Sequence, residues 1–196
     1  MEAIVVVDMQ NDFVYPEGAL YVPSYKEERN FLGSDNEFVD NVARYIKEHD
    51  NDYSIYTMDY HPEDSIEFDV FPPHCVKNTA GADIIPNISA LFGRNGSLVG
   101  SLVIKGTDSH IHSYSISTAN KFNSLIYKMR SLDIKRVNVI GVAYDYCVGE
   151  SAIAIKNQGF ETTVIRDLTK SVSIKSANLT DQKLNLYGVS IGYQLY

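Results

Sequence analysis

Cysteine is scarce in this chain and tryptophan is missing. Its two cysteines, Cys75 and Cys147, stand far apart among 196 residues. Secreted proteins that depend on disulfides carry more cysteines in shorter chains, so the sequence argues against a disulfide scaffold. A chain of this length can bury most of its unfolded surface without such cross-links. We therefore expect a single domain over residues 1–196.

Positive charge is also in short supply. The chain carries 17 Lys and Arg against 25 Asp and Glu, which gives a formal net charge of -8. Proteins that bind nucleic acid or anionic membranes independently of sequence rely on dense Lys and Arg. We therefore expect neither nucleic acid nor a membrane among the partners of this protein.

Long hydrophobic runs are not found either. The N-terminal apolar run covers only Ala3 to Val7 before it meets Asp8, and no basic stretch precedes it, so it does not resemble a secretory signal. No stretch approaches the roughly 20 apolar residues of a membrane span. We expect a cytoplasmic protein.

Short β-branched runs alternate with helical patterns along the chain. Strands are expected over residues 3–7, 53–58, 98–104, 136–142, 161–165 and 189–193. Apolar residues at helical spacing predict helices over residues 36–49, 120–132, 147–158 and 176–186. This alternation predicts an α/β fold with a parallel sheet covered on both faces. The nearly all-apolar strands agree with a sheet that is buried on both sides.

Four side chains with possible chemistry follow predicted strands: Asp8, Asp59, Lys105 and Cys147. Each has an ordinary explanation when taken alone, because Asp often forms turns, Lys is usually solvated and Cys is usually core. In open α/β sheets, however, ligands bind outside the carboxyl ends of the strands. Four such residues at one edge therefore predict a catalytic site.

Cys147 is the first residue of a predicted helix, a position that favours ionisation of its thiol. A helix N-terminus and a nearby Lys ammonium both favour a thiolate. Converting a thiol of pKa ~8.5 into a mostly ionised form at neutral pH takes about two pKa units, or roughly 2.7 kcal/mol. Alternatively, an adjacent carboxylate removes the proton during nucleophilic attack.

Asp59 and His61 form a second candidate cluster with His74. Residues two apart on an extended segment point to the same side, and His74 can fold back onto them. One carboxylate and two imidazoles suit zinc, iron or manganese with open coordination positions. Glu67 lies between them in the sequence and is a further candidate ligand. A surface loop with solvated histidines is the alternative interpretation.

Two other features imitate a metal site. His110 and His112 have no accompanying carboxylate, so we interpret SHIHS as a polar loop. Cys75 follows His74 directly, and we interpret it as structural.

Five separated blocks resemble the isochorismatase-like cysteine hydrolases, and among them the nicotinamidases. The blocks are DMQNDF with the later GAL, Asp59-x-His61-Pro, FPPHC with the later NT-x-GA, IKGTD around Lys105, and GVAYDYC ending at Cys147. They occur in the family's order and cover the chain from Ala3 to about Ser171. The resemblance implies a three-layer α/β/α sandwich with a six-stranded, mainly parallel sheet.

The resemblance also implies site residues. The family's catalytic triad falls on Asp8, Lys105 and Cys147. A cis peptide bond is implied between Val142 and Ala143, and the N–H groups of Ala143 and Cys147 are implied to form the oxyanion hole. Such donors stabilise the charge that develops on a tetrahedral intermediate.

The metal cluster corresponds to the site that distinguishes nicotinamidases from isochorismatases. The resemblance implies one divalent ion, with zinc favoured and iron or manganese as alternatives, held by Asp59, His61 and His74. Some members add a ligand near the position of Glu67. The implied activity is hydrolysis of nicotinamide to nicotinate and ammonia through a thioester, as part of NAD salvage. In this family the metal is an anchor for the pyridine nitrogen.

The substrate pocket is implied at Phe13 and Tyr114, with Phe13 as a wall against the ring. Three features depart from the family pattern. Tyr144 stands where a Thr is common, the segment from Tyr25 to Asp35 has no counterpart, and SHIHSYSIS after Lys105 matches only loosely around Tyr114 and Ser115. Another small amide or ureide, including a pyrazinamide-like compound, is the alternative substrate. An inactive ligand-binding relative is the alternative class. Family members often assemble, so a homo-oligomer is also expected.

Overall fold

A computed structural model of the chain describes residues 1–23, 34–92 and 100–194. Its six strands form one all-parallel sheet in the order β3-β2-β1-β4-β5-β6. Their bounds are Glu2–Val7 for β1, Tyr53–Asp59 for β2, Gly100–Lys105 for β3, Arg136–Val142 for β4, Glu161–Lys170 for β5 and Ser190–Gly192 for β6. The predicted six-stranded parallel sheet is confirmed.

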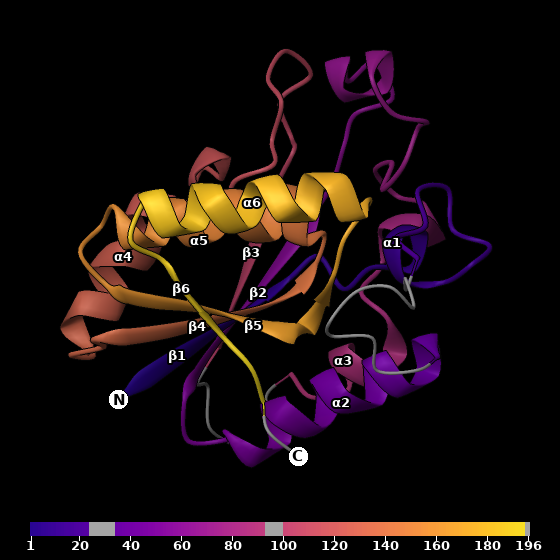
Figure 1. The fold of residues 1–196 in the computed structure, drawn as a ribbon. Helices are drawn as coiled ribbons and strands as arrows, with labels where there is room; N and C mark the ends of the chain where they lie inside the picture. The colour runs from indigo at the N-terminus through magenta and orange to yellow at the C-terminus, as the bar shows by residue number, and fades with distance from the viewer. Residues whose placement is uncertain (24–33, 93–99, 195–196) are drawn as a thin grey trace.

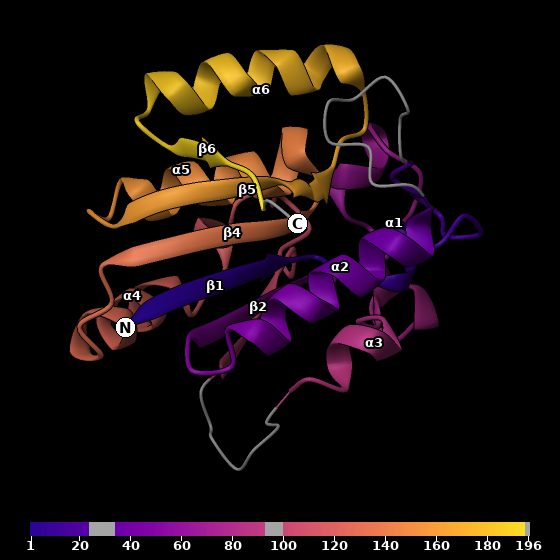
Figure 2. The ribbon, with the colours of Figure 1, turned by 60° about the horizontal axis from the view of Figure 1, so that its bottom comes forward.

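Helices cover both faces of this sheet, as Figures 1 and 2 show. The helices are α1 (Asn11–Val14), α2 (Asp35–Glu48), α3 (Pro86–Ser89), α4 (Phe122–Ser131), α5 (Gly149–Lys156) and α6 (Ile174–Leu186). One face packs against α2 and α3, and the other packs against α4, α5 and α6. The predicted three-layer sandwich is therefore confirmed. In the described ranges, each helix is too short or too polar to cross a membrane.

The central strand β1 explains how one sheet supports two hydrophobic cores. Successive side chains of a strand point to opposite faces. Val5 and Val7 accordingly belong to the core under α4, α5 and α6, whereas Ile4 and Val6 belong to the core under α2 and α3. All four side chains are at most 1% exposed, which is why this strand reads as an uninterrupted apolar run.

Two element boundaries differ from the predictions. The helix expected to begin at Cys147 begins earlier, with a π-type turn over Tyr144–Val148 that leads into α5. Strand β5 continues to Lys170 instead of ending at residue 165. The extension contains a bulge, because Val139 pairs with Val164 while Gly141 pairs with Thr169. The polar residues of this bulge interrupt the apolar pattern on which the shorter prediction was based.

Most of the predicted insertion from Tyr25 to Asp35, and the first two residues of the strand predicted over 98–104, lie outside the described residues. The implied cis peptide bond between Val142 and Ala143 is present. Gly159, just after the end of α5, has a φ of 91°, the positive φ that favours glycine after a helix.

The carboxyl ends of five neighbouring strands meet at one edge. Asp59 at the end of β2 pairs with Lys105 at the end of β3, and Val142 at the end of β4 pairs with Lys170 of β5. Asp8 follows β1 between them. The sheet therefore gathers the candidate site residues at the edge where ligands bind in such folds.

Candidate active site

Asp8 occupies a constrained position directly after β1. Its φ of 48° lies in the left-handed region, and the hydroxyl of Thr57 donates a hydrogen bond of 2.6 Å to its Oδ1. The side chain is fully buried. Burial raises the pKa of Asp8 above its ordinary value, and the nearby ammonium of Lys105 opposes this effect only in part. A carboxylate with a raised pKa is suited to accept a proton.

Lys105 joins three functional groups. Its Nζ lies 2.5 Å from Asp59 Oδ1 and 2.9 Å from Asp8 Oδ2, and it donates to Cys147 Sγ at 3.6 Å. Burial alone lowers the pKa of this amine, but the carboxylates of Asp59 and Asp8 outweigh it and raise the pKa well above its ordinary value. The two carboxylates therefore favour the charged form of this buried amine.

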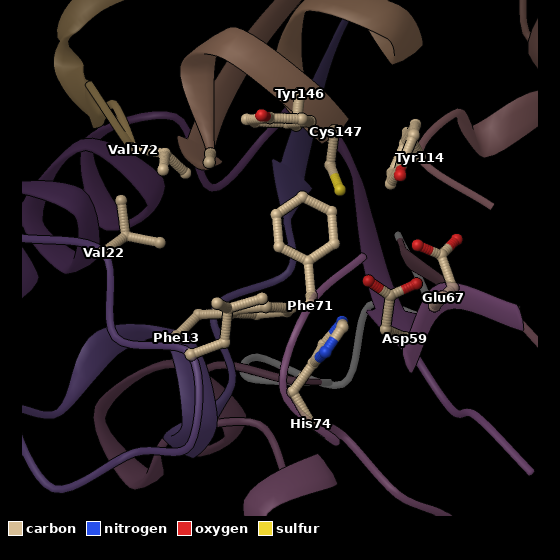
Figure 3. Close-up of a pocket in the computed structure, with 12 residues that line it drawn as sticks. Phe13, Val22, Asp59, Glu67, Phe71, His74, Tyr114, Tyr146, Cys147 and Val172 are labelled. Atoms are coloured by element: carbon tan, nitrogen blue, oxygen red, sulfur yellow. The ribbon is translucent and has the colours of Figure 1, made fainter. Parts of the chain in front are cut away.

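Cys147 lies in the π-type turn, where the N–H of Val148 donates to the carbonyl of Ala143 at 3.0 Å. Single π turns are frequent at functional sites. Figure 3 shows its sulfur pointing into a pocket. Burial raises the pKa of the Cys147 thiol well above its ordinary value, although Lys105 acts in the opposite direction. Burial thus favours the neutral thiol, which suits proton removal by a carboxylate during the attack.

Asp59, His61 and His74 lie together beside this triad. Each offers one donor atom, and the three donor atoms lie within 4.8 Å of one another. The Nδ1 of His74 lies 2.8 Å from the carbonyl of Pro72, so Nδ1 is the donor and Nε2 keeps a free lone pair. Metal-binding histidines typically use this arrangement, with the second nitrogen bonded to an oxygen.

His61 is the strongest indication of a metal in this group. Its side chain is 1% exposed, and neither ring nitrogen has a hydrogen-bond partner among the described residues. A buried imidazole without partners is costly, and a bound cation would satisfy it. The described donors therefore fit a divalent metal.

Gln10 fixes the backbone of Asp59, a role that sequence reasoning missed. Its Nε2 donates to the carbonyls of Asp59 at 2.8 Å and of Ala82 at 2.7 Å, and its Oε1 accepts from the N–H of Asp59 at 2.8 Å. The only indication in the sequence was its place in the DMQNDF block. Burial acts to raise the pKa of Asp59, but Lys105 and His61 outweigh it and the pKa is lowered.

Glu67 is buried near the donor group but is not one of the three clustered donors. Its Oε1 accepts from the N–H of Ser113 at 2.5 Å, and its Oε2 lies 3.6 Å from Nδ1 of His112. His110 and His112 lie in an exposed loop, as expected. A ligand role for Glu67 stays a prediction, and its contact with His112 was not foreseen.

An apolar pocket lies between the triad and the metal donors (Figure 3). Phe13 and Tyr114 line it, as the resemblance implied, and so do Ala143 and Cys147. Five further side chains were not predicted: Leu20, Val22, Phe71, Tyr146 and Val172. Tyr146 lies in the π-type turn beside Cys147. The other four come from irregular segments, where hydrophobic periodicity gives no indication of which residues converge.

Phe71 stands at the centre of the aromatic lining. Its ring packs edge-on against Tyr146 at 5.5 Å, His74 at 6.2 Å and Tyr114 at 6.3 Å between centroids. Figure 3 shows it between Cys147 and His74. Phe13 lies 5.4 Å from the ring of His74. Aromatic rings thus surround the space between nucleophile and metal donors, which suits a flat apolar ring.

The model of the isochorismatase domain matches residues 2–187 of the chain. The nicotinamidase of Saccharomyces cerevisiae is 26% identical over 204 residues, covering 88% of this chain and 89% of that protein. The nicotinamidase/pyrazinamidase of Mycobacterium tuberculosis is 28% identical over 185 residues, covering 88% of each chain.

Two solved structures share the fold over almost the whole chain. The pyrazinamidase of Pyrococcus horikoshii in complex with zinc is 28% identical, with a TM-score of 0.78 and coverage of 98% of this chain and 99% of that one. A protein from L. infantum in complex with nicotinate is 26% identical, with a TM-score of 0.79 and coverage of 98% and 92%.

Proposed function

The chain belongs to the isochorismatase family, and we propose that it is a nicotinamidase, which hydrolyses nicotinamide to nicotinate and ammonia. The observation that carries this proposal is that one pocket holds both the nucleophile and the metal donors. In it, Cys147 Sγ accepts a hydrogen bond of 3.6 Å from Lys105 and faces the buried group of donors. Relatives that are nicotinamidases, and a related structure that holds nicotinate, support the same substrate. The reaction would serve NAD salvage.

The first half of the reaction forms a thioester. Asp8 takes the proton of the Cys147 thiol, and the sulfur attacks the amide carbon. The N–H groups of Ala143 and Cys147 stabilise the oxyanion, a contribution worth about a hundredfold to a thousandfold in rate for each donor. Asp8 then returns the proton to the leaving ammonia, and the C–N bond breaks.

The second half of the reaction releases the acid. Asp8 removes a proton from a water molecule, which attacks the thioester carbon while the same two N–H groups hold the oxyanion. The C–S bond breaks and Cys147 recovers its proton from Asp8. Lys105 orients the Asp8 carboxylate throughout and stabilises the sulfur anion as it forms, because its charge lies beside both atoms.

Asp59, His61 and His74 would hold one divalent ion. Two imidazoles and one carboxylate with open positions favour zinc, with iron and manganese as alternatives. Glu67 is a further candidate ligand. When bound, the ion supplies a Lewis acid to which a ring nitrogen of the substrate can bind. The family resemblance implies that this anchoring places the carboxamide over the thiol of Cys147.

Pyrazinamide is a second candidate substrate, because it shares the ring nitrogen and the carboxamide of nicotinamide. The relative from Mycobacterium tuberculosis is a nicotinamidase/pyrazinamidase. An inactive ligand-binding role is disfavoured, since the contacts of Lys105 with Asp8 and Cys147 are intact.

A substrate panel tests this function. We would measure ammonia release by the zinc-loaded protein from nicotinamide, pyrazinamide, benzamide and a small ureide. Nicotinamide should react fastest, and benzamide should react far more slowly because it has no ring nitrogen. Equal rates with benzamide and nicotinamide, or a preference for the ureide, would contradict the proposal.

A further inference from the structure

A partly buried ion pair that the proposed chemistry does not use lies behind the pocket wall. Lys170 ends β5 and pairs with Val142, the residue before Ala143. Its side chain is 3% exposed, and its Nζ contacts Oδ1 of Asp35, the first residue of α2. A Lys is almost never buried without a partner, so this contact ties the catalytic edge of the sheet to the start of α2.

Two aromatic rings complete what we call the Lys170 cluster, namely Lys170, Asp35, Tyr21 and Phe38. The hydroxyl of Tyr21 donates to Asp35 Oδ2 at 2.7 Å. The Lys170 ammonium lies 4.9 Å from the ring centroid of Phe38 and 5.5 Å from that of Tyr21. Such distances give cation–π attraction. Asp35 thus binds Lys170 through one oxygen and Tyr21 through the other.

Tyr21 lies between two residues of the pocket wall. Leu20 and Val22 line the pocket, and their N–H groups donate to the carbonyls of Asp12 at 3.1 Å and Phe13 at 2.9 Å. The hydroxyl of Tyr21 reaches Asp35, while its two neighbours line the pocket.

Val172 brings a second part of the wall to the same cluster. It lines the pocket two residues after Lys170, and its N–H donates to Asp145 Oδ1 at 2.9 Å. Figure 3 shows Val22 and Val172 on the same side of the pocket. The Lys170 cluster therefore connects the chain segments that carry Leu20, Val22 and Val172.

We propose that Lys170, Asp35 and Tyr21 are positioning residues that hold this apolar wall against the pocket and so set the affinity for a flat heteroaromatic amide. This inference rests on the proposed function for its substrate. The three side chains touch neither the nucleophile nor the metal donors. Their loss should therefore weaken substrate binding while the chemical steps proceed.

Steady-state kinetics of Lys170→Met and Asp35→Asn on nicotinamide test the proposal. Each variant should raise KM by about tenfold and leave kcat within about twofold, because the apolar wall that binds the substrate loses its support while the reacting groups keep theirs. Contacts inside one network also couple strongly. The loss of binding free energy in the double variant should be smaller than the sum of the two single losses, because Asp35→Asn alone already removes this carboxylate from the buried ammonium of Lys170. An unchanged KM, a fall in kcat alone, or strictly additive losses would overturn the proposal.

Hydrogen exchange of the same proteins gives a readout that needs no substrate. Amides of residues 18–22 should exchange faster in Lys170→Met, because local opening follows lost contacts. Lys183→Met, which breaks the exposed pair of Lys183 with Glu150, is the matched control and should change neither KM nor this exchange. Should Lys170→Met fail to fold, Tyr21→Phe removes only the hydroxyl and should shift both readouts in the same direction.

The two proposals fail in different ways. A wild-type protein that releases no ammonia from nicotinamide contradicts the proposed function, while the exchange of residues 18–22 still decides the role of the Lys170 cluster. Unchanged exchange in both Lys170→Met and Tyr21→Phe contradicts the cluster and leaves the function intact.

Discussion

The ammonium of Lys105 lies 2.5 Å from Oδ1 of Asp59, and this contact joins the catalytic triad to the metal donors. The same oxygen of Asp59 lies 3.7 Å from Nε2 of His61. One carboxylate thus belongs to both groups, and Lys105 also contacts Asp8 and Cys147. A change of charge in the triad must therefore change the electrostatic environment of the metal donors, and the reverse also holds.

Replacing Lys105 separates the two groups. Lys105→Met leaves the buried carboxylates of Asp8 and Asp59 without their cation, so we expect a lower Tm and a loss of at least about a hundredfold in kcat. Zinc affinity should not fall, because a competing cation has left Asp59. Calorimetric zinc titration and ammonia release measure the two effects. Near-wild-type turnover in this variant would argue against any catalytic role for Lys105.

Metal removal should abolish activity reversibly. His61→Ala removes the imidazole whose two nitrogens are buried without partners, so we expect it to lose stoichiometric zinc and most of its nicotinamide hydrolysis. Chelation of the wild type should have the same effect, and added zinc should reverse it. His110→Ala, in the exposed loop, is the matched control and should bind zinc like the wild type. Full activity in the metal-free protein would refute the assignment.

The pH profile should reflect the raised pKa of Asp8. A general base works only when ionised, so kcat/KM falls as the pH decreases through the pKa of the free enzyme's base. Because burial raises this pKa, the acid limb should lie above the ordinary Asp value of about 3.9.

Thr57→Val supplies the test of that assignment. The hydroxyl of Thr57 donates to the ionised carboxylate of Asp8 and lowers its pKa, so its removal should move the acid limb to higher pH. Thr118→Val, outside the pocket, should leave the limb in place. A limb that does not move in Thr57→Val would mean that a group other than Asp8 limits the rate.

Much of the site follows from strand ends that the sequence reveals. The apolar run before Asp8 and the β-branched run before Asp59 identify buried parallel strands, and such strands place their carboxyl ends at one edge. Lys105 and Cys147 were predicted at the same edge for the same reason. The distances that join them, such as 2.5 Å from Lys105 to Asp59, depend on the register of the sheet.

The remaining parts depend on segments without periodicity. Phe71 and Val172 line the pocket from loops, where no repeating pattern marks the buried side. The β5 bulge lengthens a strand through polar residues and places Lys170 beside the catalytic edge. From the sequence alone, a lysine at position 170 is expected to be solvated. Its burial is explained by its tertiary contact with Asp35.

The central claim is that Cys147 forms a thioester with nicotinamide. The direct measurement is ammonia release from nicotinamide by the zinc-loaded wild type, Cys147→Ala and Cys75→Ala, with mass spectrometry of the acid-quenched protein. Cys75 is the matched control, because its buried thiol donates to the carbonyl of Gly81 at 4.0 Å and is not among the side chains that line the pocket. We predict turnover and a nicotinoyl adduct at Cys147 in the wild type and in Cys75→Ala, and neither in Cys147→Ala. Equal ammonia release by Cys147→Ala and the wild type would contradict the claim.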